Sequence, residues 1–470
     1  MSINLLSTET LKEIFENLII NNPRSFNSRS CNSKTTKLLA KSYLLCLPKD
    51  KKEYIKKEGI CFPPAPRGRP PLFDYPSFLR ILDLDRISEM AKLWIIHRRT
   101  LTKPKQNYID ILKKTFYELF MERAEMIHSI NHSGIFGNVK TPLFDKRAPN
   151  LQKLKKIQFF EREDDTTFIE NISEVANNLQ HIIAQNRSSR LALCACKALA
   201  NLIENQNALQ HLGVIGYYHN ISIIIQSVKS QKNSLVRLEL CNMDFQYFNN
   251  NAFDALALCI HLKSFEIVNC KRTNDTCLKP WPNMFPKLQK FKFHNNVFYD
   301  IAFPTNFISK IIESANDNLR YIKIISTTPP QVNRSKVANI IAENCPNLQH
   351  LSFITLSNSE IISILDSCQK LKELKFYTEN NFDDSMFIEM AKRLPPTLQY
   401  WDLAIEAANY YPSPNAVRSF IDNIEKNSLK VFHFTSLYFG DPYLECAIKR
   451  LLEQKGIMTS FTDANVEPFY

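Results

Sequence analysis

Cysteine and histidine are the residues of this chain that could ligate a metal or act in nucleophilic catalysis, but their spacing favours neither role. Cys194-Ala-Cys196 lacks a second pair of ligands at zinc-finger spacing. His128 and His132 stand four residues apart on an expected helix, yet no glutamate completes an HExxH motif. The sequence therefore predicts no catalytic group, no metal site, no cofactor and no enzymatic activity.

Glycine is scarce, with 8 residues among 470. Loops that hold phosphate groups need closely spaced glycines, because only a residue without Cβ lets backbone N–H groups close around an anion. The motifs GxGxxG, GxxxxGKS/T and GxSxG are all missing. Rossmann enzymes, P-loop NTPases and typical α/β-hydrolases are poor candidates, although 44% apolar and 23% charged residues suit a globular protein.

The net charge of +12 is concentrated near the N-terminus. Residues 1–110 contain 20 basic and 11 acidic groups, so the remaining 360 residues are almost neutral. A nucleic-acid partner requires clustered Lys and Arg, and Lys49 to Lys57 is the densest run. A solvated helix face explains such a run more simply, and we rank nucleic-acid binding as the weaker alternative.

Targeting and membrane signals are not visible in the sequence. No apolar run reaches 18 residues, and the N-terminus has no basic segment followed by an apolar one. Twelve cysteines in 470 residues are too sparse for a disulfide scaffold. We expect free thiols, no membrane partner, and a location in the cytoplasm or nucleus.

One pattern, LxxLxLxx followed by Asn or Cys, recurs from about residue 150 to the end. Its fullest copies are Leu262-Lys-Ser-Phe265-Glu-Ile267-Val-Asn-Cys270 and Leu288-Gln-Lys-Phe291-Lys-Phe293-His-Asn-Asn296. Repeats start at residues 154, 179, 209, 235, 262, 288, 319, 348, 371, 398 and 429. This spacing is typical of leucine-rich repeats, in which each unit supplies one strand.

Segments with helical spacing lie between the expected strands. The runs that begin at Phe307, Val337, Ile361 and Phe387 place apolar residues on one helix face. One strand and one helix cannot bury their own apolar surface, but stacked neighbours can. We therefore predict an α/β leucine-rich-repeat solenoid over residues 150–470, with about 10–11 repeats, a parallel sheet on the concave face and helices on the convex face.

Several cysteines occupy equivalent positions in these repeats. Cys259, Cys345 and Cys368 each precede a repeat leucine by three residues, while Cys241 and Cys270 follow strands. Small, polarizable side chains at equivalent positions favour core packing over redox or metal chemistry.

Residues 5–18 are expected to form an amphipathic helix. Ser7 can cap it, and its apolar stripe includes Leu11, Ile14, Phe15 and Leu18. Together with Leu6 and Glu9, this run resembles the first helix of an F-box, LPxExLxxIFxxL, with Ser7 in place of proline. An F-box followed by leucine-rich repeats resembles the substrate receptors of SCF ubiquitin ligases.

The resemblance implies roles for the two ends of the chain. Residues 1–20 would bind a Skp-type adaptor, and through it a cullin ligase, by means of Leu6, Glu9, Leu11, Ile14, Phe15 and Leu18. The repeats would capture the protein to be ubiquitinated. Residues 21–33 are polar and contain no tryptophan, so only the first F-box helix is matched. A leucine-rich-repeat scaffold without adaptor binding is the alternative.

Residues 21–149 are expected to link this helix to the repeats and to cap their apolar end. Apolar spacing predicts helices over residues 34–58 and 76–130. The segment 63–71 between them is rich in proline and is expected to be a stiff, extended loop.

Polar positions that alternate with the repeat leucines are expected to face the concave side. In successive repeats the central positions run from acidic to basic residues. The predicted target-binding residues are Arg237, Glu239, Glu266, Lys292, Tyr321, Lys323, Lys375, Tyr377, Tyr400 and Asp402. Interfaces are often enriched in Tyr and Arg, so this face is predicted to bind a protein partner.

Overall fold

The computed structural model describes residues 33–63, 74–96, 105–131, 149–161, 166–186, 193–216, 219–295, 303–326, 333–353, 356–378, 383–405, 413–424, 428–436 and 449–463. The chain divides into two compact units, residues 1–231 and 232–470. The predicted adaptor-binding residues and most of the proline-rich loop lie outside the described residues.

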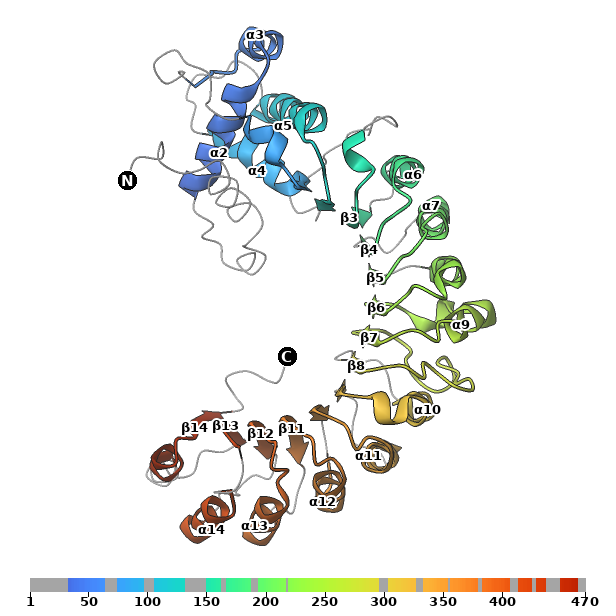
Figure 1. Cartoon of the computed structure of the whole chain (residues 1–470), viewed down its shortest axis with the longest axis vertical. Coiled ribbons are helices and arrows are strands. Elements are labelled where there is room, and N and C mark those ends of the chain that lie inside the picture. The colour runs from blue at the N-terminus through green and yellow to red at the C-terminus, as the bar shows by residue number, and fades with distance from the viewer. Residues whose placement is uncertain are drawn as a thin grey trace. The chain divides into compact units, whose positions relative to one another are not determined.

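The described part of the first unit has helices first and then a series of strands and helices (Figure 1). Its helices are α2 (Ser33–Cys46), α3 (Lys49–Lys57), α4 (Leu84–Ile96), α5 (Lys105–Arg123), α6 (Thr166–Val175), α7 (Leu193–Glu204) and α8 (Ile221–Ser227). Its strands are β1 (Ile81–Asp83), β2 (Ser129–Asn131), β3 (Lys156–Glu161), β4 (His181–Asn186) and β5 (His211–Gly216). Short 3-10 helices occur at Tyr75–Phe78, Pro149–Leu151 and Val228–Gln231.

The second unit contains β6 to β14. Its strands are β6 (Arg237–Cys241), β7 (Ser264–Val268), β8 (Lys290–Asn295), β9 (Tyr321–Ser326), β10 (His350–Phe353), β11 (Glu373–Thr378), β12 (Tyr400–Ile405), β13 (Val431–Ser436) and β14 (Met458–Asp463). Its helices are α9 (Asn250–Ala257), α10 (Thr305–Ala315), α11 (Asn333–Asn344), α12 (Asn358–Ser367), α13 (Asp384–Arg393) and α14 (Pro414–Ile424), with 3-10 helices at Phe245–Tyr247 and Asn316–Asn318.

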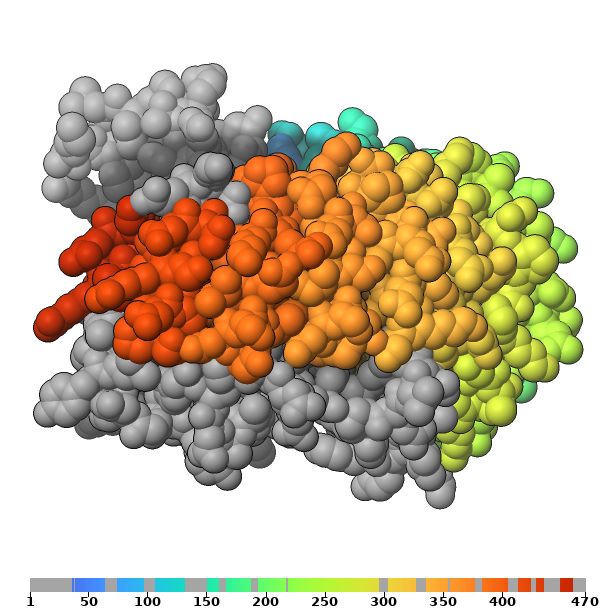
Figure 2. Space-filling model, turned by 90° about the horizontal axis from the view of Figure 1, so that it is seen from below, coloured from blue at the N-terminus to red at the C-terminus, as the bar shows by residue number. Residues whose placement is uncertain are grey.

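The described strands are parallel and follow chain order within each unit, β1 to β5 and then β6 to β14. In the second unit the strands line the inner side of a curve and α10 to α14 line its outer side (Figure 1). Helices α10 to α14 contact one another in sequence order, and Figure 2 shows the same order as a passage from yellow to red. This is an α/β leucine-rich-repeat solenoid, as the sequence predicts.

Each repeat buries the leucine-type side chains of its strand. In register, Leu238 lies opposite Phe265, which is followed by Phe291 and Ile322 on the next strands, and all four are buried. Because strand side chains alternate between the two faces, the intervening polar residues must lie on the opposite, inner face. We call this inner face of β6 to β14 the concave face.

The repeat pattern predicts β3 to β13 correctly. Each of the eleven repeat starts lies two residues before one of these strands. The helical runs that begin at Phe307, Val337, Ile361 and Phe387 lie in α10 to α13, as expected.

Three further strands were not expected from the pattern. Residues 76–130 were predicted to be helical, but they contain β1 and most of β2 as well as α4 and α5. Leu79, Leu82 and Leu84 fill the LxxLxL positions around β1, so parallel strands begin well before residue 150. Strand β14 has Thr459 and Phe461 at the corresponding positions, and threonine obscures the pattern.

The helical start of the first unit has its own core. Helix α2 packs against α4, and both α3 and α4 pack against α5. The rings of Tyr43 and Phe120 meet edge to face with centroids 4.7 Å apart, and Trp94 Nε1 donates a hydrogen bond to the Cys61 carbonyl oxygen at 3.2 Å. The segment 34–58 is helical as predicted, with a break at Leu47 and Pro48.

The predicted buried positions are confirmed for four of the five repeat cysteines. Cys259, Cys345 and Cys368 are buried, and the Cys368 thiol donates to the Cys345 carbonyl oxygen at 3.4 Å. Burial raises the pKa of Cys259 and of Cys368 to about 12, so both stay protonated at neutral pH. Cys270 is buried too, whereas Cys241 is half-buried.

Among the described helices, none combines the length and apolar character needed to cross a membrane.

Candidate functional site

The polar positions predicted for the concave face form one row across the second unit. Strand register pairs each residue of this row with the next. In order, the central row is Glu239, Glu266, Lys292, Lys323, Ser352, Lys375, Asp402 and His433. Equivalent repeat positions therefore place eight side chains side by side, acidic at β6 and β7 and basic at β8 and β9.

A second row lies two residues earlier in each strand, on the same face. It is Arg237, Ser264, Lys290, Tyr321, His350, Glu373, Tyr400 and Val431. Arg237, Tyr321 and Tyr400 of this row were predicted to bind the target, whereas Lys290, His350 and Glu373 were not among the predicted target-binding residues. The period of two along a strand was the signal that could have found them, because residues i and i+2 share a face.

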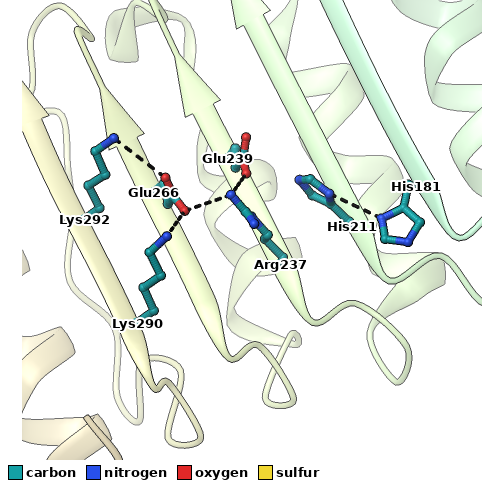
Figure 3. Close-up of polar contacts among 7 residues, drawn as sticks. All are labelled: His181, His211, Arg237, Glu239, Glu266, Lys290 and Lys292. Carbon is teal, nitrogen blue, oxygen red and sulfur yellow. Dashed lines mark hydrogen bonds and ion pairs between the residues drawn. The ribbon is translucent and has the colours of Figure 1, made fainter. Parts of the chain in front are cut away.

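Glu266 organises the acidic end of the concave face (Figure 3). Its carboxylate is only 9% exposed, and Oε1 lies 3.1 Å from Arg237 Nη2 and 2.8 Å from Lys290 Nζ. Lys292 Nζ approaches Oε2 at 3.9 Å, and Arg237 also forms an ion pair with Glu239. A carboxylate this deeply buried needs such partners, and the three cations of this cluster outnumber its two carboxylates.

A second ion-pair cluster lies on β10 to β12. Glu373 Oε2 is 3.0 Å from His350 Nδ1, and Glu373 Oε1 is 3.2 Å from Lys375 Nζ. The Lys375 ammonium also stands 4.7 Å from the centre of the Tyr400 ring, a cation–π contact. The Tyr400 hydroxyl donates to Asp402 Oδ2 at 3.5 Å.

The two carboxylates of this cluster have opposite pKa shifts. Burial alone would raise the pKa of Glu373, but hydrogen bonds from His350 and Lys375 lower it below its usual value. Burial raises the pKa of Asp402, and the nearby charges of Lys375 and His433 oppose that rise only in part. Folding therefore favours the ionised form of Glu373 and the protonated form of Asp402.

This difference predicts how acid affects stability. A carboxyl group with a lowered pKa stabilises the fold above its unfolded pKa, and this contribution is lost as the pH falls through its folded pKa. Carboxyl groups titrate between about pH 6 and 3. Over this range we expect the unfolding free energy of Glu373→Gln to fall less steeply than that of the wild type. For Asp402→Asn we expect a steeper fall than in the wild type, because a carboxyl group with a raised pKa stabilises the fold as the pH falls and the variant lacks this contribution. Urea unfolding at several pH values measures both slopes, and equal slopes for the two variants would contradict the assignment.

The middle of the concave face has an unbalanced positive charge. Lys323 on β9 is half-buried and lies between Lys292 and Ser352 in the central row. Burial is the main cause that lowers the pKa of Lys323, and the neighbouring charges of Lys292 and Lys375 lower it further. Among the described residues, Lys323 has no carboxylate within ion-pair distance.

The first unit places two histidines next to each other on β4 and β5. His181 Nδ1 and His211 Nδ1 are 3.4 Å apart, and the two rings meet edge to face (Figure 3). Both side chains lie on the same strand face, because His181 and His211 are paired in register. The described residues contain no group of three or more His, Cys, Asp or Glu that could hold a metal ion.

Two sets of predicted site residues lie partly or wholly outside the described part of the chain. Tyr377 belongs to β11 opposite Ala404, but its side chain is outside the described part of the chain. The six residues assigned to adaptor binding all precede the first described residue.

The fold and its polar strand face define the class of protein, an α/β leucine-rich-repeat solenoid. No family model matches the chain, and no curated protein matches its sequence. Solved structures with a similar fold include an internalin (inlF) from Listeria monocytogenes, with 14% identity over 67% of this chain and 82% of that chain and a TM-score of 0.38.

Two other solved structures show a comparable likeness. One is a complex of Rad7 and Elc1 in yeast, with 14% identity over 62% of this chain and 77% of that chain and a TM-score of 0.35. The other is the leucine-rich repeat-containing protein LegL7 from Legionella pneumophila, with 11% identity over 66% of this chain and 93% of that chain and a TM-score of 0.31. The fold assignment rests on the strands and register described above.

Proposed function

We propose that this chain is a non-catalytic protein-binding protein whose concave face captures a target protein. The observation that carries the proposal is the pair of parallel rows on this face, which combine charged groups with the aromatic rings of Tyr321 and Tyr400. Such rings supply contact area at low cost in conformational entropy, and complementary charges select and orient a partner.

The finer form of the proposal concerns the N-terminus. Residues 5–18 resemble an F-box helix, so the chain would act as the substrate-recognition subunit of an SCF-type ubiquitin ligase in the cytoplasm or nucleus. Leu11, Ile14 and Phe15 would bind the Skp-type adaptor, and the concave face would hold the target. A leucine-rich-repeat scaffold that does not bind the adaptor is the second candidate, supported by the lack of any further F-box helix pattern in residues 21–33.

Affinity purification of the full chain and two variants tests both parts. In Ile14→Asp/Phe15→Asp, charges replace two apolar anchors, and we expect loss of a Skp-type adaptor with retention of targets. In Lys292→Glu/Lys323→Glu/Lys375→Glu, we expect the reverse result, because charge reversal on the concave face opposes a complementary partner. Absence of the adaptor from the wild-type sample favours the scaffold.

A matched control uses lysines away from the concave face. Lys310 and Lys392 lie on helices α10 and α13, and Lys279 is exposed in the segment between β7 and β8. Lys279→Glu/Lys310→Glu/Lys392→Glu changes the net charge equally and should keep all partners. Partners that survive reversal on the concave face, or that are lost equally from the control, contradict target capture by that face.

A further inference from the structure

Among the described residues, Lys323 differs from the other lysines of the concave face because no acidic partner pairs with it. Lys290 and Lys292 approach Glu266, and Lys375 pairs with Glu373. No carboxylate among the described residues comes within ion-pair distance of Lys323. A half-buried ammonium group has lost part of its hydration, so a new anion beside it would restore favourable interactions.

Lys323 lines a small hollow on β9, β10 and β11, which we call the Lys323 hollow. Its polar lining residues are Tyr321, Lys323, His350, Ser352, Glu373 and Lys375, and its volume is about 50 Å³. Sites for small organic ligands usually measure about 300–1,000 Å³. The Lys323 hollow is therefore of a size for one compact group rather than for a whole metabolite.

The hollow also offers hydroxyl donors. The side chains of Tyr321 and Ser352 make no hydrogen bond to another residue in the described part of the chain. Ser352 is adjacent to Lys323 in register, so its hydroxyl and the ammonium lie on neighbouring strands of the same face. An ammonium with an adjacent hydroxyl is suited to the two or more oxygens of a carboxylate or phosphate.

The carboxylate within the hollow does not neutralise it. Glu373 already accepts hydrogen bonds from His350 and Lys375 on its two oxygens. Lys292 and Lys375 both raise the positive potential at Lys323. Glu373 opposes them less strongly, so the charges around the Lys323 ammonium favour an incoming anion.

We propose that the Lys323 hollow accepts one anionic side chain, a carboxylate or a phosphate, from a protein segment that lies across β9 to β11. Lys323 forms the ion pair, Ser352 donates a hydrogen bond, and the Tyr321 ring packs against the segment. This inference rests on the proposed function, since it names the chemistry that the concave face selects in its target.

Peptide libraries test this selection without knowledge of the target. Three libraries share randomised flanking residues and differ in a fixed central residue, which is glutamate, phosphoserine or glutamine. Against the immobilised full chain, we expect about tenfold or greater enrichment of an anionic library over the glutamine library, the value of a charge-assisted hydrogen bond. The better retained of the two anionic libraries identifies carboxylate or phosphate as the preferred group.

Variants assign the effect to the hollow. Lys323→Met keeps the length and packing of the side chain and should abolish the enrichment, and Ser352→Ala should reduce it. Lys279→Met, which removes an exposed lysine between β7 and β8, should leave it unchanged. Thermal unfolding checks that Lys323→Met is folded. Its unfolding temperature should not fall, because the substitution removes the desolvation cost of a half-buried charge.

The outcomes are separable from those of the proposed function. Equal retention of all three libraries, no retention of any, or enrichment that survives Lys323→Met overturns the proposal. In a further outcome, partner proteins still bind the charge-reversal variant of the concave face while enrichment of the anionic library depends on Lys323. That result would contradict target capture by the concave face and support the anion site.

Discussion

Alanine at Gly216 is expected to destabilise the first unit by about 3–5 kcal/mol, the sum of an unfavourable backbone conformation and a steric clash. Gly216 ends β5 with φ of +123°, a conformation that side-chain-bearing residues rarely adopt. A Cβ atom at this position would lie 1.8 Å from the backbone oxygen of Asn186 on β4. Because Asn186 is paired in register with Gly216, relief of the clash requires the two strands to separate.

Gly456 provides the matched control for this prediction. Its φ is +74°, but a Cβ atom there would meet nothing within 4 Å. Gly456→Ala should therefore cost only about 1 kcal/mol, the penalty for left-handed backbone. Urea unfolding followed by circular dichroism measures both variants. Similar losses for the two would show that β4 and β5 absorb the clash without separation.

Period-two patterning explains how much of the fold could be predicted. A strand that buries Leu238 and Leu240 must alternate them with polar residues, and this constraint is visible in the sequence. The same constraint predicted the central row, because parallel strands of equal repeats align equivalent positions. At β14, Thr459 and Phe461 stand at the register positions of the repeat leucines, so the leucine pattern could not reveal that strand.

Buried polar residues were beyond the reach of the same pattern. Gln206 stands three residues before the repeat leucine Leu209, the position that cysteine occupies in later repeats. Its side chain is buried, accepts a hydrogen bond from the Leu179 N–H at 2.8 Å, and donates to the Ala176 and Leu202 carbonyl oxygens at 3.0 and 2.8 Å. Glutamine is usually exposed, and only the three-dimensional arrangement of orphan backbone groups explains why it is buried here.

Cross-strand charge pairing was also invisible to the sequence. Glu239 and Glu266 were predicted as exposed target-binding residues, but the Glu266 carboxylate is nearly buried among Arg237, Lys290 and Lys292. Pairing depends on side-chain rotamers and on the register of separate repeats, neither of which composition reveals. Lys323 lies in the same central row yet has no such acidic partner among the described residues, and this difference emerges only from the structure.

Truncation of Trp401 is expected to destabilise the second unit about as much as Gly216→Ala destabilises the first. Trp401 occupies a repeat-leucine position on β12 and is fully buried. The centroid of its ring lies 5.2 Å from that of Phe432 and 5.6 Å from that of Phe420. The ring centroids of Phe376 and Phe387 are both 6.4 Å away. Trp401→Ala should cost about 3–5 kcal/mol, because it removes these contacts and leaves a cavity.

Trp401→Phe separates packing from polarity at the same position. The indole Nε1 is buried and has no hydrogen-bond partner among the described residues, so phenylalanine removes an unsatisfied donor while it keeps an aromatic ring. The two effects oppose each other, and we expect a net change below about 1.5 kcal/mol. Chemical unfolding compares the variants, and an equal loss of unfolding free energy for both would contradict a packing role.

Since repeats contact mainly their sequence neighbours, amide hydrogen exchange in Trp401→Ala should accelerate most in β11 to β13 and least in β6 and β7.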